Sequence, residues 1–464
     1  MTVALDMFHG KSVAVLGLAR SGNATLAALK AGGATTLAWD DGETARAACA
    51  AAGFAVVAPE RWPWAELAAL VPSPGVPTSH ELFACARSVG AEIVGDIELL
   101  QRACPAPRYL GVTGTNGKST TTALIAHIAP RAGLAVEAGG NLGTPALALK
   151  PLGTDGVYVL ELSSFQLDLT NALSFDIAVL LNITPDHLDR HGGMDGYVAA
   201  KRKVFRAGRL KHAVIGIDDE PSRTIAAAMA SDDVAVIPVA VGRACPDGIA
   251  VIDGVVHEAG RAMFDLSGAR TLPGAHNWQN AGVAYAATRA LGIDPSAIEA
   301  ATLDFPGLAH RIETIATLDG VRYVNDSKAT NADAAARALA CFETIYWIAG
   351  GRPKAGGIGS LAPWFARIAR AYLIGEAEAE FAATLEGHVP YRRCGDLRSA
   401  LRAARDDARR DGRPNPVVLL SPASASYDQF ANFEARGEAF RALVGALANP
   451  SAEVPVATTR RAAP

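Results

Sequence analysis

The sequence has few cysteines and no strong excess of either charge. Its six cysteines are scattered and form no C-x-x-C pair. This spacing argues against a zinc site or a disulfide framework and fits a reducing cytosol. The formal net charge is only −4, which gives no electrostatic case for binding nucleic acid or an anionic membrane surface. We therefore expect a cytoplasmic protein with no nucleic-acid partner.

Long apolar runs are also missing. No stretch approaches 18 apolar residues without a charge or a turn former, so we expect no membrane span. The first residues, MTVALDMFHGKS, lack a basic segment followed by an apolar core, so we expect no signal peptide. Residues 451–464 are rich in proline, alanine and threonine, and we expect them to form a disordered tail.

What the sequence does contain is an alternation of short apolar runs with helical stretches over 464 residues. This pattern predicts an α/β protein with parallel sheets throughout. The length exceeds what one hydrophobic core serves. We expect a Rossmann-like domain at 1–104, a central domain with a phosphate-binding loop at 105–306 and a Rossmann-like C-terminal domain at 307–450.

A glycine-containing turn follows the first apolar run. The stretch from Gly17 to Gly22, GLARSG, joins a strand to a helical segment but lacks the middle glycine of G-x-G-x-x-G. As a dinucleotide fingerprint it is weak. A helix packed closely on a sheet, with no ligand, explains the segment equally well.

The clearest chemical signal is GVTGTNGKSTTT at 111–122, between an apolar strand and a helix. Its glycines depart from the spacing of G-x-x-x-x-G-K-[ST]. Gly114 and Gly117 nevertheless leave backbone N–H groups free to face an anion at a helix start. Lys118 supplies a cation for terminal phosphates, and Ser119 offers a hydroxyl for Mg²⁺. The stretch predicts a phosphate site.

Three further residues follow in the central domain. Glu161 ends an apolar strand, where a carboxylate can hold the metal of an ATP site, although a helix N-cap or an ion pair is the alternative. Taken alone, His187 in NITPDHLDRH is more typical of a polar loop than of a metal ligand. Lys201 in YVAAKRKVF is, by itself, typical of a solvated charge.

Later motifs carry polar side chains to helix starts and strand ends. Asn277 and Asn280 in GAHNWQN can cap a helix or contact adenine. Arg311 in LAHRIE can bind a phosphate or pair with Glu313. In the third domain, NDSKATN, GGRPKAGG and SPASASYDQFANFEARG each follow a predicted strand, so their loops converge on one sheet edge. They predict a pocket for a small dianionic molecule, formed by Lys328, Thr330, Lys354 and Ser426.

Taken together, these motifs resemble those of the Mur ligases, in order, over about residues 10 to 448. The absence of a D-N-P-R motif and the presence of NDSKATN and SPASASYDQF resemble the glutamate-adding branch. The resemblance implies an ATP-dependent amide ligase of peptidoglycan precursor synthesis that adds D-glutamate to UDP-N-acetylmuramoyl-L-alanine through an acyl phosphate. It also implies two Mg²⁺ ions, an N-carbamylated Lys201 and a monomer.

The resemblance implies roles for individual residues. Those implied for catalysis are Lys118, Glu161, His187 and Lys201, and those for metal binding are Ser119, Glu161, His187 and Lys201. ATP contacts are implied for Gly114, Thr115, Asn116, Gly117, Lys118, Ser119, Thr120, Asn277, Asn280, Arg311 and Asp326. UDP-substrate contacts are implied for Leu18, Ala19, Ser73, Pro74, Gly75, Asn141 and His187. Contacts to the amino acid are implied for Lys328, Thr330, Lys354, Ser426 and Phe433.

Some positions depart from the family pattern. Asp41 and Gly42 stand where a Thr-Arg pair is common, which leaves the uracil contacts open. The sequence does not reveal the chirality of the amino acid, which depends on pocket geometry, so an L-glutamate-adding ligase is one alternative. A folylpolyglutamate synthase-like enzyme is another. The latter would lack a separate domain before the phosphate loop. An NAD-dependent dehydrogenase would need the missing glycine of GLARSG, and a non-catalytic relative would be expected to lose Lys118, Glu161 or Lys201.

Overall fold

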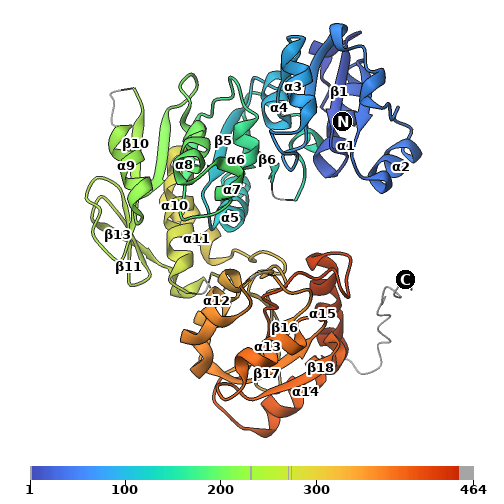
Figure 1. The fold of residues 1–464 in the computed structure, drawn as a ribbon. Coiled ribbons are helices and arrows are strands. Elements are labelled where there is room, and N and C mark those ends of the chain that lie inside the picture. The colour runs from blue at the N-terminus through green and yellow to red at the C-terminus, as the bar shows by residue number, and fades with distance from the viewer. Residues whose placement is uncertain are drawn as a thin grey trace. The chain divides into compact units, whose positions relative to one another are not determined.

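The computed structural model describes residues 3–141, 143–229, 233–269, 271–272, 274–354 and 356–448. The predicted tail at 451–464 lies outside the described residues. The chain divides into two compact units, one of Met1–Ala269 with Asn277–Phe305 and one of Arg270–His276 with Pro306–Pro464. Figure 1 traces the chain through three β-sheets, two in the first unit and one in the second. The domain limit near residue 104 stays a prediction.

The N-terminal sheet has four parallel strands. In spatial order they are β2 (Thr35–Trp39), β1 (Ser12–Leu16), β3 (Leu67–Pro72) and β4 (Glu92–Ile93). The helices are α1 (Arg20–Ala31), α2 (Glu43–Ala51), α3 (Glu81–Ser88) and α4 (Asp96–Ala103). Alternate residues of β1 enter two different core clusters, since successive strand side chains point to opposite faces. Buried residues of α1 and α4 belong to one cluster and those of α3 to the other.

The second sheet of this unit has nine strands. In spatial order they are β13 (Arg261–Asp265), β12 (Val255–Glu258), β11 (Ile249–Ile252), β10 (Ala235–Val241), β9 (His212–Gly216), β8 (Ile177–Leu180), β5 (Arg108–Thr113), β7 (Gly156–Glu161) and β6 (Ala135–Gly140). Its helices are α5 (Lys118–Arg131), α6 (Ser164–Asp168), α7 (Leu188–His191), α8 (Met194–Arg202), α9 (Glu220–Ala228), α10 (His276–Ala290) and α11 (Pro295–Leu303). Every residue of β7 is buried, as expected for a central parallel strand covered on both faces.

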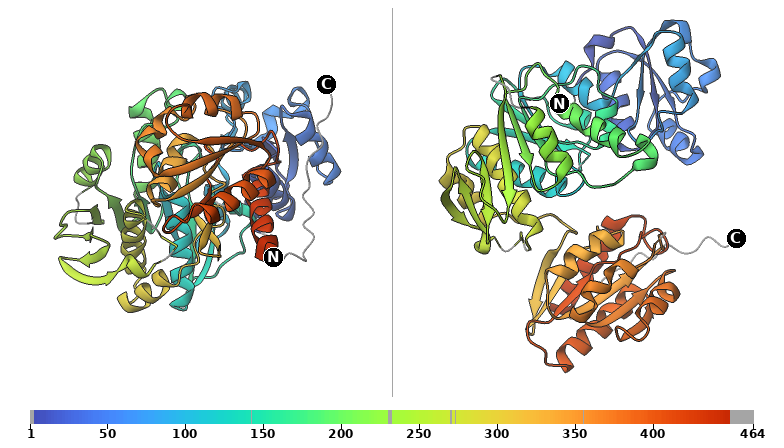
Figure 2. Two further views of the ribbon diagram at one scale, coloured as in Figure 1. Left: turned by 90° about the horizontal axis from the view of Figure 1, so that it is seen from below. Right: turned by 60° about the vertical axis from the view of Figure 1, so that its left-hand side comes forward.

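The C-terminal unit has a six-stranded sheet. In spatial order its strands are β14 (Glu313–Leu318), β15 (Val321–Asn325), β19 (Val417–Leu420), β16 (Ile345–Gly350), β17 (Ile368–Ile374) and β18 (Tyr391–Gly395). Its helices are α12 (Ala332–Ala340), α13 (Glu378–Leu385), α14 (Leu397–Arg410) and α15 (Phe433–Ala448). The helices lie on both faces of the sheet (Figure 2): α12 and α13 contribute to one core cluster, α14 and α15 to the other.

The α/β fold class is confirmed, but the expectation of parallel sheets throughout is wrong. β11, β12 and β13 pair antiparallel, and β14 pairs antiparallel with β15. The turns supply the reason. Asp253-Gly254 and Asp319-Gly320 both have positive φ at each residue, 49° and 82° in the first and 51° and 79° in the second. This conformation favours a tight hairpin whose twist matches its strands, and Asp-Gly is its usual sequence.

Short 3-10 helices complete the described chain. They are η1 (Asp6–Phe8), η2 (Pro59–Arg61), η3 (Trp64–Glu66), η4 (Ala146–Ala148), η5 (Lys203–Phe205), η6 (Leu266–Gly268) and η7 (Gly359–Arg367). Of these, η4 contacts both α1 and α4. The two sheets of the first unit therefore share one buried core, and two cavities described below are lined by residues from both.

Candidate active site

The predicted phosphate loop joins β5 to α5. Gly117 is the residue before α5 and has φ +83°, in the left-handed region that favours glycine. Its Cα also lies close to another chain segment: a Cβ there would come within 2.0 Å of Asn280 Oδ1. The Asn116 N–H donates to Asn182 Oδ1 at 2.9 Å, which ties the loop to the end of β8. The glycine and this tie place the start of α5 at the sheet edge, where the first N–H groups of a helix have no acceptor within the helix.

Asn277 and Asn280 lie beside the same loop. Both side chains are buried, Asn280 Nδ2 donates to Asn277 Oδ1 at 3.0 Å, and Thr121 Oγ1 donates to Asn280 Oδ1 at 3.4 Å. Asn280 therefore supports the phosphate loop directly. The adenine contact implied for these two residues stays a prediction.

Glu161 ends β7 and is 2% exposed. Its Oε1 accepts a hydrogen bond of 2.7 Å from Asn141 Nδ2, while its Oε2 is buried without a hydrogen-bond partner. The helix-cap alternative is wrong for this residue, since Ser163 caps α6 through a capping box with Gln166. A buried carboxylate oxygen without a donor is costly to keep, and it is available to a cation.

Lys201 is buried in α8, so the solvated-charge interpretation is wrong. It is 1% exposed, its Nζ donates to Gly114 O at 2.8 Å, and it lies 4.7 Å from the ring centre of Tyr197. The Nζ of Lys118 donates to the same carbonyl at 2.8 Å. Burial, and then the charge of Lys118, lowers the pKa of Lys201 to about 6. This amine is therefore neutral at pH 7.

A cavity of about 320 Å³ collects the predicted catalytic residues Lys118, His187 and Lys201. His187 has φ +51° and a half-exposed ring, which lies 4.9 Å from the ring of Phe165. Asn141 also lines this cavity, and it connects Glu161 to it through the hydrogen bond above. The lining residues that the sequence did not predict are Ser163, Ser164, Phe165, Asp186 and Tyr197.

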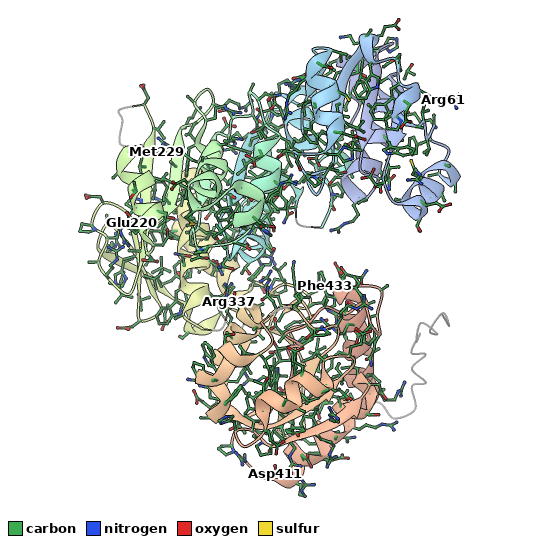
Figure 3. All side chains as sticks on the ribbon, viewed as in Figure 1. Arg61, Glu220, Met229, Arg337, Asp411 and Phe433 are labelled. Atoms are coloured by element: carbon green, nitrogen blue, oxygen red, sulfur yellow. The ribbon has the colours of Figure 1, made fainter. Side chains whose placement is uncertain are left out.

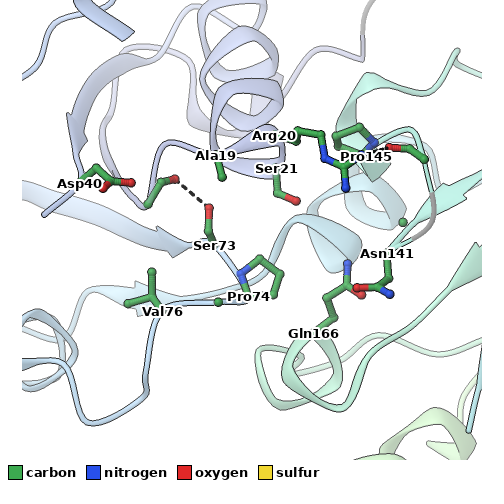
Figure 4. A pocket seen from close by; sticks show the side chains of 14 residues that line it. Ala19, Arg20, Ser21, Asp40, Ser73, Pro74, Val76, Asn141, Pro145 and Gln166 are labelled. Atoms are coloured by element: carbon green, nitrogen blue, oxygen red, sulfur yellow. Dashed lines mark hydrogen bonds between the residues drawn. The ribbon is translucent and has the colours of Figure 1, made fainter. Parts of the chain in front are cut away.

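Figure 4 shows a second cavity, of about 360 Å³. It shares Pro74, Gly75 and Asn141 with the first. Of the residues predicted to contact the UDP substrate, Ala19 and Ser73 also line this second cavity. Leu18 does not line it; it is buried, and its N–H donates to Asp40 Oδ2 at 2.7 Å. Residues that the sequence analysis missed are Gly17, Arg20, Ser21, Asp40, Val76, Gly140, Gly143, Pro145 and Gln166.

The loop after β2 lacks the arginine that the family pattern carries, but an arginine from α2 contacts it. The guanidinium of Arg46 lies 4.6 Å from the ring centre of Trp39. It donates to Asp40 O at 2.6 Å and to Asp41 O at 2.8 Å. Asp40 in turn accepts from Gly42 N at 2.8 Å. These bonds hold the Asp40 carboxylate at the cavity wall.

In the C-terminal unit, the predicted loops follow β15, β16 and β19, which are neighbours in the sheet. The loops therefore share one edge, as predicted. Lys328 Nζ lies 5.4 Å from the ring centre of Phe433, which begins α15 and is labelled in Figure 3. Ser426 is buried and Lys354 is exposed. Thr330 donates its N–H to Lys328 O at 2.9 Å.

Asp326 and Arg311 lie near this edge. Asp326 is 4% exposed and accepts from Ser421 Oγ at 2.8 Å and from Ile312 N at 3.1 Å. Burial raises the pKa of this carboxyl to about 7. Glu313, the alternative partner of Arg311, is paired with Arg441 at 2.6 Å. The nucleotide contacts implied for Asp326 and Arg311 stay predictions.

In the C-terminal unit, Arg436 is a buried residue that the sequence did not predict. Its guanidinium donates to Ser327 Oγ at 3.0 Å, Ser327 O at 2.9 Å and Ser424 O at 3.1 Å. A fourth bond, of 3.4 Å, goes to Ala425 O. Gly351 lies against the same group, since a Cβ there would come within 3.1 Å of Arg436 Nη1. One side chain thus contacts all three loops.

The predicted Mg²⁺ can be compared with the side chains that are present to bind it. Among the described residues, no group of three or more His, Cys, Asp and Glu side chains could hold a metal ion. Mg²⁺ needs no such cage, because it is usually held by one or two carboxylates together with substrate phosphates. The unpartnered Oε2 of Glu161 and the hydroxyl of Ser119 at the start of α5 fit that mode.

A strand–glycine loop–helix on a parallel sheet, with a buried carboxylate on the next strand, defines a nucleotide-binding α/β protein. Comparison with known families narrows this class. Residues 112–288 match the Mur ligase middle domain and residues 310–424 the Mur ligase glutamate ligase domain. The chain belongs to the Mur ligase family, and the resemblance inferred from its motifs is confirmed.

Several relatives are similar over nearly the full length. The UDP-N-acetylmuramoylalanine–D-glutamate ligase of Paramagnetospirillum magneticum is 50% identical over 452 residues, which are 96% of this chain and 98% of the relative. The enzyme of that name from Caulobacter sp. is 50% identical over 462 residues, 96% and 98% of the two chains.

Solved structures match the fold at lower identity. The UDP-N-acetylmuramate-alanine ligase of Thermotoga maritima superposes with a TM-score of 0.62 at 17% identity, covering 96% of this chain and 100% of that one. No described helix is long and apolar enough to cross a bilayer.

Proposed function

We propose that this protein is an ATP-dependent ligase that joins D-glutamate to UDP-N-acetylmuramoyl-L-alanine in peptidoglycan precursor synthesis. The observation that carries the proposal is the joined pair of cavities, which links the phosphate loop and Lys201 to the predicted UDP site. Relatives that are 50% identical over nearly their whole length bear the name of this activity. The alternative, a ligase for L-glutamate, differs only in the stereochemistry of the amino-acid pocket.

The reaction has two steps. A carboxylate oxygen of the alanyl group attacks the γ-phosphorus of ATP, the bond to the β-phosphate oxygen breaks, and ADP leaves. The amine of glutamate, having lost a proton, then attacks the acyl carbon; the carbon–oxygen bond to phosphate breaks and an amide remains. Lys118 and the N–H groups at the start of α5 bind the charged phosphoryl oxygens. Bound Mg²⁺ would neutralise charge on those oxygens, held by Ser119 and Glu161.

We further propose that Lys201 is N-carbamylated and that, together with His187, it supports a second Mg²⁺. Carbamylation requires a neutral amine, and Lys201 is buried with one carbonyl as its hydrogen-bond acceptor. A carbamate would place an anion next to the cation of Lys118, so the two side chains would attract each other. We also propose that the protein is a cytoplasmic monomer; sedimentation of the purified protein tests the oligomeric state.

An amino-acid panel with coupled phosphate detection tests the function. We expect phosphate release from ATP only when UDP-N-acetylmuramoyl-L-alanine and D-glutamate are both present. L-glutamate, lysine and meso-diaminopimelate serve as matched controls and should give no release. Release with L-glutamate but not with D-glutamate would overturn the specificity, and release without the UDP substrate would overturn the ligase assignment.

A further inference from the structure

The 320 Å³ cavity contains a serine whose hydroxyl is hydrogen-bonded to a histidine with a buried side chain. Ser164, the first residue of α6, lines the 320 Å³ cavity, and its Oγ lies 3.0 Å from His191 Nε2. The other ring nitrogen of His191, Nδ1, lies 3.3 Å from Asp168 Oδ2. Asp168 Oδ1 accepts from Lys203 Nζ at 2.7 Å. Four side chains from α6, α7 and η5 therefore form one connected chain.

The histidine in this chain of contacts is closely packed. The His191 side chain is 3% exposed, and its ring packs between Phe165 and Tyr197, with ring centres 5.7 Å and 5.5 Å away. The Tyr197 hydroxyl lies 3.1 Å from Thr115 Oγ1 in the phosphate loop. The orientation of the histidine is thus fixed relative to the loop that would bind ATP.

The carboxylate sets the direction of the hydrogen bonds. The Asp168 carboxylate accepts from Lys203 through Oδ1 and from His191 Nδ1–H through Oδ2, and the second bond fixes the histidine tautomer. In the neutral ring, Nε2 then carries a lone pair and accepts the Ser164 hydroxyl proton. With its proton committed to the histidine, Ser164 Oγ can only accept hydrogen bonds in the cavity.

The order of the cavities indicates what donates to Ser164. If the UDP end of the substrate occupies the 360 Å³ cavity, then its carboxylate end lies in the 320 Å³ cavity, beside Lys118 and Lys201. The N–H nearest to that carboxylate is the amide N–H of the L-alanyl residue. We propose that Ser164 accepts a hydrogen bond from this amide N–H, and that His191 and Asp168 are positioning residues that aim its oxygen. This inference rests on the function proposed above.

The test combines a protein change with a matching substrate change. An analogue in which L-lactate replaces L-alanine carries an ester oxygen in place of the amide N–H. With the wild-type enzyme we expect kcat/KM for the alanyl substrate to exceed that for the ester analogue by about ten-fold, the effect of one hydrogen bond. With Ser164→Ala, kcat/KM for the alanyl substrate should fall to near that for the ester analogue. The kcat/KM for the ester analogue should stay the same.

Two further variants separate positioning from structure. His191→Phe keeps the ring contacts with Phe165 and Tyr197 but cannot hold Ser164, so the alanyl-to-ester ratio should fall to about three-fold. Ser164→Thr keeps a hydroxyl and should restore most of the ratio. An equal loss with both substrates in Ser164→Ala, or an unchanged ratio, would overturn the inference. Failure of the wild type to release phosphate with either substrate would instead overturn the proposed function.

Discussion

Among the described residues, each of the two units buries one long basic side chain, and the two side chains have different surroundings. Lys201 and Arg436 are both 1% exposed. Lys201 donates to one carbonyl and has the cation of Lys118 beside it. Burial and this neighbouring charge lower the pKa of Lys201 to about 6. Arg436 donates to four oxygens, and burial lowers its pKa only to about 10. At pH 7 the lysine is neutral and the arginine is charged.

The difference shows how burial can serve opposite purposes. A buried guanidinium with its donors satisfied stays charged and fixes the surrounding backbone. A buried amine with a single acceptor loses its proton and gains nucleophilic character. In this protein the first arrangement fixes the three loops at the edge of the C-terminal sheet, and the second leaves a neutral amine in the 320 Å³ cavity.

Replacing Lys201 should have the largest effect. We expect Lys201→Ala to lower kcat by about 100- to 1000-fold, the cost of removing one preorganised charged group from an active site. A short carboxylate such as formate should restore part of the activity, because it can occupy the space of the proposed carbamate. Lys211→Ala, at an exposed lysine, is the matched control and should stay active. Full activity in Lys201→Ala would contradict a catalytic role for Lys201 and leave both buried side chains with a structural role.

Replacing Arg436 should act on stability and on amino-acid binding. Arg436→Met leaves the carbonyls of Ser327 and Ser424 without a donor, so we expect the C-terminal unit to lose about 2–4 kcal/mol of unfolding free energy. KM for the amino acid should rise more than kcat falls.

The matched control for Arg436 is Arg441→Met on the same helix. Arg441 forms partly exposed ion pairs with Glu313 and Glu438, which contribute about 1 kcal/mol or less. Denaturant unfolding and initial-rate kinetics supply both readouts. If the two variants lost equal amounts of unfolding free energy, the buried Arg436 would contribute no more to stability than the partly exposed Arg441.

A smaller effect is expected from the buried carboxyl of Asp96 in the first unit. Burial raises its pKa from 3.8 to about 6, partly offset by the N–H of Ile97 and by Ser21. Because the folded state binds the proton more tightly, stability falls as pH rises from about 4 to about 6 and stays reduced above it. Asp96→Asn should therefore stabilise the protein by about 2 kcal/mol at pH 7.5 and by nothing near pH 4.

Thermal unfolding midpoints of the wild type and Asp96→Asn across this pH range would measure the effect. Asp155→Asn, at an exposed carboxylate, is the control and should show no such dependence. A stabilisation that is the same at pH 4 and pH 7.5 would contradict the raised pKa.

The fold was largely predictable because its signals are local. Apolar runs bounded by glycine gave β1, β5 and β7, and GTNGKST gave the loop before α5. The antiparallel hairpins were also present in the sequence, as the Asp-Gly pairs at 253–254 and 319–320. They were missed because the alternation of strands and helices was extended over the whole chain.

The site was less predictable because burial and partners depend on tertiary contacts. Nothing near Lys201 in the sequence shows that its Nζ meets Gly114 O. The contact between Ser164 and His191 joins α6 to α7, and those from Arg436 join α15 to loops about 110 and 12 residues earlier. Only the family resemblance pointed to Lys201, whereas Ser164, His191 and Arg436 required the structure.

The most direct test of the contrast between buried Lys201 and buried Arg436 is ¹³C NMR of the protein in ¹³C-bicarbonate. The account predicts one carbamate carbon signal in the wild-type enzyme that persists in Arg436→Lys and is absent from Lys201→Ala. No carbamate signal at saturating bicarbonate, or the same signal in Lys201→Ala, would contradict it.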